Sequence, residues 1–395
     1  MNWASEKNNG LRPWEQVQAI YVHIPFCVQK CLYCDFVSYA CHDRQLQQDY
    51  VDAVCREIAL RRTELSISPQ ATIYFGGGTP SVLRPSELGK IAAALKEYGY
   101  WQQPAEATIE VNPGTAALAD LQQLRAYGFD RISFGVQSLH NAELRSIGRI
   151  HTAQQALEAV ALARQAGFER INADIMYGLP GQTLASLRET LAQICAAEAE
   201  HLSVYGLILE EGTPLTRLVE QGKVQLPDED LAADMYEMVQ DYLQKEGFER
   251  YEVSNYARDK RQSQHNLAYW RYLPYEAFGA AACAFDGRQR RTGTEDVRAY
   301  IAGCRSNAPV YHTEVLTDGE RLSEFMFMNL RKTSGVDLAA ATERFGVDVK
   351  ERYAGEIAPL VSAGLLTWAD DGRVLRLTER GMELGNQVFE VFVTV

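Results

Sequence analysis

A chain of 395 residues with a net charge of −13 can bury one large and one smaller domain, and its 46% hydrophobic content is ordinary for a globular protein. The acidic balance argues against nucleic acid or an anionic membrane as the main partner, because those surfaces select for clustered Lys and Arg. We find no apolar run long enough for a transmembrane helix and no secretion signal in the first twenty residues, so we expect a cytoplasmic protein.

Short apolar, β-branched runs alternate with amphipathic helices along the first half of the chain. The predicted strands cover residues 20–24, 72–75, 107–111, 131–136, 171–176 and 202–209, and the predicted helices include 43–63, 153–166 and 184–196. Strands that are each followed by a helix imply a parallel sheet with right-handed crossovers. Six units are too few for the usual eight-fold closure, so we expect an α/β fold with an open, partial (β/α)6 barrel that admits a sizeable substrate.

The rest of the chain changes character twice. We predict a polar lead at 1–18, the barrel at 19–225, a region covering the barrel at 226–312, and a winged-helix-like α+β domain at 313–395. The covering region should hold a long helix at 228–247, a strand at 251–254 and irregular aromatic chain to about 311. The last domain should hold helices at 320–330, 338–345 and 351–363 and a hairpin at 365–377.

Winged helices often bind DNA, which would make this chain a DNA-associated regulator. From Glu314 onward, however, nine Lys and Arg stand against fourteen Asp and Glu. Such a surface repels the phosphate backbone, so we favour a packing or lid role for this domain and no nucleic-acid partner.

Three cysteines follow the first strand directly, as C-x3-C-x2-C at Cys27, Cys31 and Cys34. Three thiolates on one short loop can hold three irons of a cubane iron–sulfur cluster and leave the fourth iron open to a small chelating molecule. The alternatives are a zinc site completed by His23 or His42, or thiols without a shared role. The five other cysteines share no spacing, and we interpret most of them as small buried side chains.

Polar or glycine-rich residues follow the other strands too. Residues 76–80, GGGTP, are not a dinucleotide fingerprint, but three glycines let the backbone approach a ligand closely. Glu110, Gln137 and Asp174 stand at or near strand ends, which meet at the carboxyl edge of a parallel sheet where ligands bind. The alternative for Gln137 and Asp174 is that each caps a neighbouring helix.

The cysteine spacing resembles the signature of the radical SAM superfamily. A finer resemblance covers nearly the whole chain and is to the branch that contains oxygen-independent coproporphyrinogen III oxidase and a haem chaperone relative. It is carried by YVHIPFC, GGGTP, IEVNP, ISFGVQS with the Arg149 that follows, and DIMYGLPGQT. The resemblance implies a [4Fe–4S] cluster on the three cysteines, S-adenosylmethionine (SAM) on its open iron, and an electron donor for the cluster.

The same resemblance implies roles for residues at the strand ends. Those expected near the cluster-bound SAM are Tyr21, Gly77, Gly78 and Thr79, with Glu110 on a ribose hydroxyl or the amine and Gln137, Arg149 and Asp174 on the rest of the cofactor. The residue types suit these roles, because a carboxylate accepts from hydroxyl groups and Arg offers a fixed fork to a carboxylate.

Two departures separate this chain from the oxidase pattern. Phe36 stands where the oxidase has a fourth cysteine, and only about twenty residues precede Tyr21 where the oxidase has a longer extension. Both are features of the chaperone relative, which is taken to bind haem and pass it to apo-haemoproteins. We therefore expect a haem-binding chaperone, with oxygen-independent coproporphyrinogen dehydrogenase as the alternative.

A further match supports haem as a ligand: His265, Asn266, Tyr269 and Trp270 fit the H-N-x-x-Y-W motif associated with the haem chaperone. Imidazole is a common axial ligand of haem iron, and flat aromatic side chains stack on a porphyrin face. The alternative is a purely structural histidine. Nearby basic residues could meet the haem propionates, although a solvated loop is favoured for them: Arg288, Arg290 and Arg291.

Overall fold

The computed structural model describes residues 10–61 and 63–393, so that positions 1–9 of the predicted lead lie outside the described residues. All six predicted strands are present and pair side by side in parallel, in chain order. They are β1 (Gln16–Ile24), β4 (Ser66–Gly77), β5 (Ala107–Val111), β6 (Arg131–Gln137), β7 (Arg170–Tyr177) and β8 (His201–Gly206). Their apolar side chains, such as Phe75 and Ile132, are fully buried.

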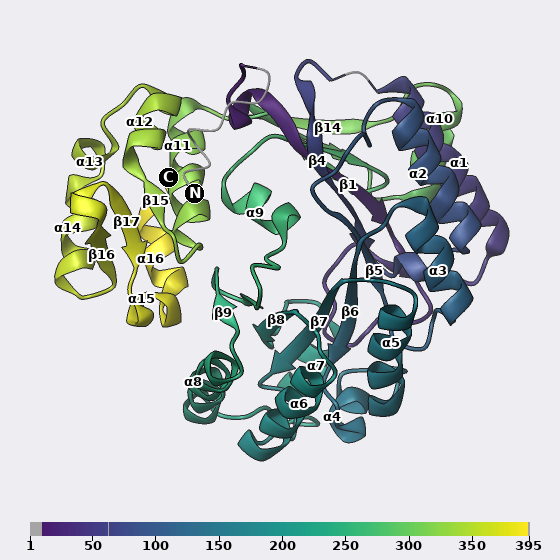
Figure 1. Cartoon of the computed structure of the whole chain (residues 1–395), viewed down its shortest axis with the longest axis horizontal. Helices are drawn as coiled ribbons and strands as arrows, with labels where there is room; N and C mark the ends of the chain where they lie inside the picture. The colour runs from purple at the N-terminus through teal and green to yellow at the C-terminus, as the bar shows by residue number, and fades with distance from the viewer. Residues whose placement is uncertain (1–9, 62, 394–395) are drawn as a thin grey trace.

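Helices follow the strands, and most of them cover the outer face of the curved sheet (Figure 1). They are α1 (Arg44–Leu60), α2 (Pro85–Glu97), α3 (Leu118–Tyr127), α4 (Asn141–Ser146), α5 (Ala153–Gln165), α6 (Leu184–Ala196), α7 (Pro214–Glu220) and α8 (Glu229–Lys245). Side-chain caps set the starts of several of them: Asp43 accepts from the first turn of α1, and Thr183 from that of α6. Gly128, in the left-handed conformation, ends α3.

The sheet extends well beyond the six predicted strands. β11 (Tyr275–Phe278) pairs in parallel with β1, and β12 (Cys283–Phe285), β13 (Gln289–Gly293) and β14 (Tyr311–Val315) continue the sheet antiparallel, with α10 (Val297–Arg305) before β14. The prediction of irregular chain up to about residue 311 was therefore wrong. β11 and β12 are too short to give a long apolar run, and β13 and β14 are rich in polar residues. Residues 286–288 connect β12 to β13, and Asp286 Oδ1 accepts from the backbone N–H groups of Arg288 and Gln289.

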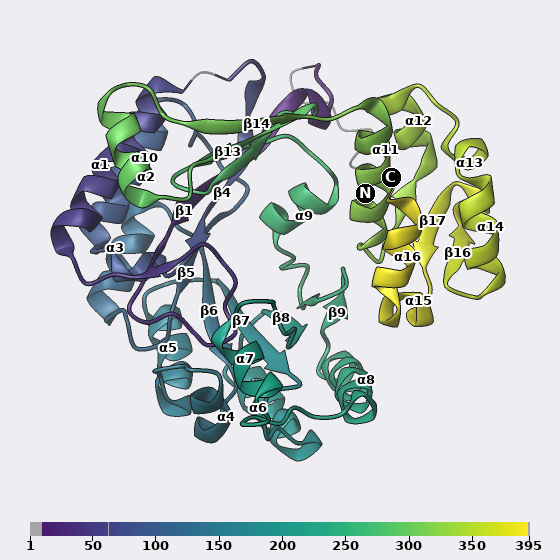
Figure 2. The ribbon, with the colours of Figure 1, turned by 180° about the vertical axis from the view of Figure 1, so that it is seen from behind.

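The opposite end of the sheet also differs from expectation. The predicted strand at 251–254 is a connection between β9 (Glu249–Arg250) and β10 (Asn255–Ala257), which pair antiparallel. The Glu252 carboxylate causes the turn, because it accepts from the Ser254 backbone at 3.2 Å and from the Asn255 amide. β10 pairs antiparallel with β8, and the end strands β14 and β9 of the described sheet do not pair with each other. The barrel is open, and α9 (Gln264–Trp270) lies inside its curve (Figures 1 and 2).

The C-terminal part forms its own core beside the opening of the barrel (Figure 2). It comprises α11 (Asp318–Leu330), β15 (Val336–Asp337), α12 (Leu338–Phe345), α13 (Val349–Arg352), α14 (Ala354–Ser362), β16 (Leu366–Ala369), β17 (Val374–Leu377), α15 (Glu379–Glu383) and α16 (Gly385–Phe392). The predicted helix at 351–363 is broken at Tyr353, whose backbone leaves helical geometry. Across residues 10–61 and 63–393, no helix has the length and apolar character needed to cross a bilayer.

Candidate cofactor and haem site

The concave face of the barrel is polar because side chains on each strand alternate between two faces. On the outer face, residues such as Ile109 and Ile171 are fully buried with the helices. The inward-facing residues between them line a cavity of about 310 Å³: Thr108, Glu110, Arg131, Ser133, Asn172, Asp174, His201 and Ser203. A packed barrel would carry apolar layers here, so this interior is built to hold a polar ligand.

Residues 25–40, here called the cysteine loop, leave the sheet at the end of β1. Two short parallel strands close the base of the loop: β2 (Phe26–Cys27) and β3 (Tyr39–Ala40). At the tip, the Leu32 backbone donates to Ile147 O at 3.0 Å and accepts from Leu215 N at 2.9 Å. The loop is therefore held at both its base and its tip by backbone hydrogen bonds.

The glycine segment after β4 holds the start of this loop. Gly78 N donates to Ile24 O at 2.8 Å, and Thr79 N donates to Phe26 O at 2.7 Å. A Cβ on Gly78 would lie 2.7 Å from Phe26 O, and a Cβ on Gly77, whose φ is +112°, would lie 2.4 Å from the His23 ring. Gly78 is needed for the close approach of two backbones, and Gly77 makes room for the His23 ring; both also line a cavity.

A cavity of about 140 Å³ brings most of the predicted cofactor residues together. Its walls include Cys27, Cys31, Cys34, Gly77, Gly78, Thr79, Glu110, Gln137, Arg149 and Asp174. Thr79 Oγ1 donates to Cys27 Sγ at 3.6 Å, and Arg149 donates to Cys31 Sγ at 3.5 Å. Tyr21 does not line this cavity and lies instead on a larger neighbouring one.

The thiols and their neighbours fit an iron–sulfur cluster better than a zinc ion. His23 has a hydrogen-bond partner on each ring nitrogen, Tyr21 Oη at 2.9 Å and Val37 O at 2.9 Å, so it is not free to complete a zinc site. His42 is exposed, away from the cavity walls. Within the described residues, no group of three His, Cys, Asp or Glu side chains converges on a single ion. A cubane binds its thiolates at separate irons and does not need them to converge.

Three polar side chains at the strand ends point at the cavity and do not cap helices. Glu110 accepts from Tyr74 Oη at 2.7 Å and from Gly77 N at 3.2 Å, and burial raises the pKa of its carboxyl to about 7. Asp174 accepts from Asn172 Nδ2 at 2.7 Å, and burial raises its pKa also. Gln137 has a φ of +67°, a left-handed conformation that is strained for a residue with a side chain and is typical of functional sites.

A third cavity, of about 690 Å³ and larger than the other two, lies next to them. Its walls are mainly aromatic and include Tyr21, Tyr74, Tyr269, Trp270, Tyr272, Tyr275, Phe285 and Phe327. Phe36 and Glu110 line all three cavities, so the three are contiguous. The side chain of Phe36 is 70% exposed where they meet, although the sequence had marked this position only as a missing cysteine.

The H-N-x-x-Y-W segment forms α9 and supplies one wall of the large cavity. His265 is buried, with Nδ1 2.8 Å from Thr72 Oγ1 and Nε2 2.9 Å from Tyr269 Oη, and burial lowers its pKa to about 3. Both ring nitrogens of this neutral imidazole therefore have hydrogen-bond partners, which is the arrangement expected of a purely structural histidine. Trp270 Nε1 is buried and has no hydrogen-bond partner among the described residues. Asn266 lines both the large cavity and the polar one.

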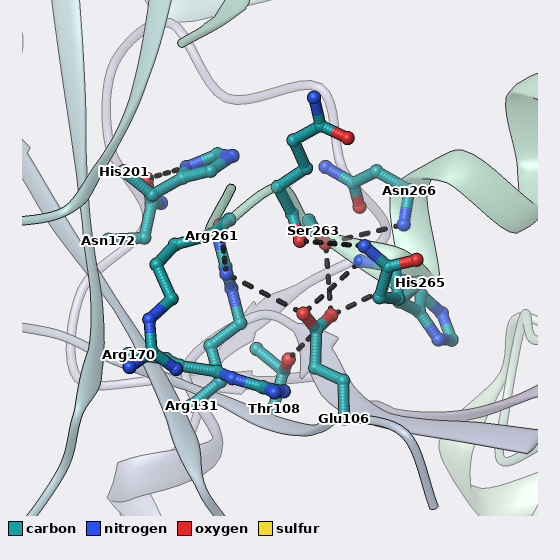
Figure 3. A network of polar contacts seen from close by, with 12 residues as sticks. Glu106, Thr108, Arg131, Arg170, Asn172, His201, Arg261, Ser263, His265 and Asn266 are labelled. Carbon is teal, nitrogen blue, oxygen red and sulfur yellow. Dashed lines mark hydrogen bonds and ion pairs between the residues drawn. The ribbon is translucent and has the colours of Figure 1, made fainter. Parts of the chain in front are cut away.

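A buried carboxylate holds α9 in place (Figure 3). Glu106, which precedes β5, accepts from Ser263 Oγ at 3.1 Å and from the backbone N–H groups of Gln264 and His265 at 3.2 Å, and it pairs with Arg131 at 3.5 Å. Ser263 in turn caps the helix by accepting from Asn266 N. The aromatic motif is thus attached to the barrel wall.

The predicted basic cluster is not a free solvated loop. Arg290 pairs with Glu324 and with Glu314 and lines the large cavity, and Arg291 pairs with Glu276 at 3.0 Å. Only Arg288 is exposed at the turn.

Comparison with known proteins agrees with this geometry. A model of the radical SAM superfamily matches residues 21–194, and a model of the HemN C-terminal domain matches residues 316–384. The heme chaperone HemW of Lactococcus lactis subsp. lactis (strain IL1403) is 34% identical over 379 residues, 96% of this chain and 98% of the relative. That of Bacillus subtilis (strain 168) is 34% identical over 382 residues, 95% of this chain and 99% of the relative.

Among solved structures, coproporphyrinogen III oxidase HemN from Escherichia coli matches with a TM-score of 0.81 at 23% identity, covering 99% of this chain and 94% of that one. This likeness shows a common fold, a partial α/β barrel followed by a C-terminal domain. The 34% sequence identity over nearly the whole length of both relatives goes further than the fold: the chain belongs to the radical SAM family that includes the heme chaperone HemW proteins.

Proposed function

We propose that this protein is a cytoplasmic haem chaperone that binds haem beside a SAM-liganded [4Fe–4S] cluster and delivers the haem to acceptor apo-haemoproteins. The observation that carries the proposal is the large aromatic cavity built on α9, contiguous with the cavity of the three cysteines. Its volume of about 690 Å³ falls in the range of cofactor pockets.

In this proposal, Cys27, Cys31 and Cys34 ligate the cluster, and an external donor supplies its electron. Bound SAM would supply one-electron chemistry at the open iron, while the protein holds the rest of the molecule. Glu110 accepts from the ribose hydroxyls or the amine, and Arg149, already directed at Cys31, meets a carboxylate or the cluster sulfurs. Gln137 and Asp174 provide polar contacts from the neighbouring strand ends.

Haem would lie in the large cavity with its faces against aromatic rings. Trp270 Nε1 offers a hydrogen-bond donor that lacks an acceptor, which a propionate oxygen can satisfy. His265 would act by orienting Tyr269, unless its two hydrogen bonds break to free a nitrogen for iron.

Haem affinity is expected to depend on the aromatic wall. Changing both Tyr269 and Trp270 to Ala should weaken haem binding at least about tenfold, or roughly 1.4 kcal/mol, because burial and stacking hold a large planar ligand. Absorption titration with haem measures the effect, and Trp270→Phe isolates the indole N–H. Trp368→Phe, in β16, is the matched control. Unchanged affinity in the double variant, with normal iron content, would place haem elsewhere.

SAM affinity should rise with pH through the titration of Glu110. Burial raises the pKa of this carboxyl to about 7, so it is mostly neutral below pH 7 and mostly ionised above it. The ionised carboxylate accepts from hydroxyl groups more strongly than the neutral acid and attracts the positive charge of SAM. From pH 6 to pH 8 we expect about a tenfold gain in affinity from this group, measured by calorimetry on reconstituted protein. In Glu110→Gln, the SAM affinity should change with pH only through the titration of the amine of SAM. An identical pH profile in both proteins would contradict this role.

The second candidate is oxygen-independent coproporphyrinogen dehydrogenase, which the contiguity of the large cavity with the cysteine cavity would permit. Phe36 at their junction favours the chaperone. Anaerobic reconstitution followed by haem titration and a coproporphyrinogen assay on one sample tests both. The proposal is supported if the protein binds haem and passes it to an apo-haemoprotein, and if it shows no SAM-dependent turnover of coproporphyrinogen. Turnover to protoporphyrinogen, or no haem binding, overturns it.

A further inference from the structure

Three rings stand in a row between the cofactor residues and the haem motif. The Tyr74 ring, on β4, stacks on the His265 ring of α9 at 4.8 Å and 28°, and on the Tyr21 ring of β1 at 6.2 Å and 28°. Tyr74 lines both the large cavity and the polar one. No sequence motif marked this residue, yet it contacts members of both predicted sites.

The hydroxyl of Tyr74 is fixed on the cofactor side. It donates to Glu110 Oε1 at 2.7 Å, and Glu110 Oε2 accepts from Gly77 N, in the segment that holds the cysteine loop. The fit is close: a Cβ on Gly76 would lie 2.7 Å from Tyr74 Cε1 and 2.9 Å from Glu110 Oε1. Tyr74 therefore cannot turn without moving away from Glu110.

On the haem side, the His265 ring under Tyr74 is equally constrained. Thr72 holds its Nδ1, and its Nε2 meets the hydroxyl of Tyr269, whose ring lies edge-on at 4.9 Å. The backbone N–H of His265 is held by Glu106. The Tyr74 ring is thus connected through His265 to Tyr269, a wall of the large cavity.

From this arrangement we infer that Tyr74 couples the two sites, so that a nucleoside whose hydroxyls bind Glu110 strengthens the binding of a planar aromatic ligand in the large cavity. The inference rests on the proposed function for the identity of the ligands, SAM and haem. A ligand that binds the Glu110 carboxylate favours the position in which this carboxylate also accepts from Tyr74, and with it the described arrangement of His265 and Tyr269. Because the planar ligand binds best against the same arrangement, each ligand raises the population that the other one binds, which is positive cooperativity.

The coupling is measured as the ratio of haem affinities with and without saturating SAM in anaerobically reconstituted protein. We expect a ratio of at least about fivefold in the wild type, and the same factor for haem acting on SAM affinity, because coupling is reciprocal. Tyr74→Phe keeps the stacked ring but loses the bond to Glu110, so its ratio should fall close to one. Tyr98→Phe, on an exposed tyrosine after α2, is the matched control and should keep the wild-type ratio.

The outcomes separate this inference from the proposed function. If the wild type binds both ligands with independent affinities, or if Tyr74→Phe keeps the full ratio, the coupling role is refuted while the chaperone proposal stands. Failure of the wild type to bind haem at all defeats both. Normal iron content and an unchanged melting temperature of Tyr74→Phe show that loss of coupling does not come from misfolding.

Discussion

Reconstituted Cys31→Ala protein is expected to hold little iron, whereas Cys41→Ala should keep the full complement. Cys31 is at the tip of the cysteine loop, on the wall of the 140 Å³ cavity and 3.5 Å from Arg149. With one of three thiolates removed, an iron loses its only protein ligand, and iron–sulfur bonds are short and directed, so distant thiols cannot replace it. Iron and sulfide analysis with the absorption spectrum measures the loss.

Cys41 is a suitable control because it lies just past the loop and is buried without lining that cavity. Its thiol contacts the Asp43 carbonyl at 3.8 Å. Equal iron in the two variants would show that the cluster, if present, is not held by the three-cysteine loop. Comparable melting temperatures would exclude a general loss of structure as the cause.

Glu106→Ala is expected to destabilise the protein by about 3–5 kcal/mol, since it leaves the buried Arg131 guanidinium without its counter-charge. The change also frees the N-terminal N–H groups of α9, which carries the aromatic motif. Urea unfolding followed by circular dichroism measures the stability. Haem affinity should fall in parallel, because α9 loses its attachment to the barrel wall.

Glu106→Gln retains an acceptor for Ser263 and should therefore cost less than the alanine change. Glu97→Ala, at the exposed end of α2, should stay within about 0.5 kcal/mol of the wild type. A Glu106→Ala protein as stable as Glu97→Ala would mean that the ion pair and the cap contribute nothing.

The regular part of the barrel could be predicted from the sequence because local pattern and tertiary environment agree there. β5 and α6 begin and end at the predicted residues, since both are bounded by turn or capping residues and bury a continuous apolar face. The cysteine, glycine and strand-end residues could also be grouped, because the carboxyl ends of parallel strands meet at one edge.

What could not be predicted depends on contacts between distant segments. β11 and β12 are very short and β13 and β14 are mostly polar, and they form a sheet because β11 pairs with the edge of β1 and the others follow it. The hydrogen bond on Nδ1 of His265 depends on Thr72, which lies on β4, 193 residues earlier in the chain. One signal was available and was not used: polar residues alternate with apolar ones on β5 to β8, which in a sheet covered by helices predicts a polar interior.

The pairing of β1 with β11 also bears on how the chain is made. β1 ends at Ile24 and its neighbour begins at Tyr275, about 250 residues later. At roughly 5–20 residues per second, a nascent chain exposes one edge of this apolar strand for about 12–50 s before its partner leaves the ribosome. Such an edge is a template for aggregation, so productive synthesis requires that this strand be shielded until translation is well past the barrel.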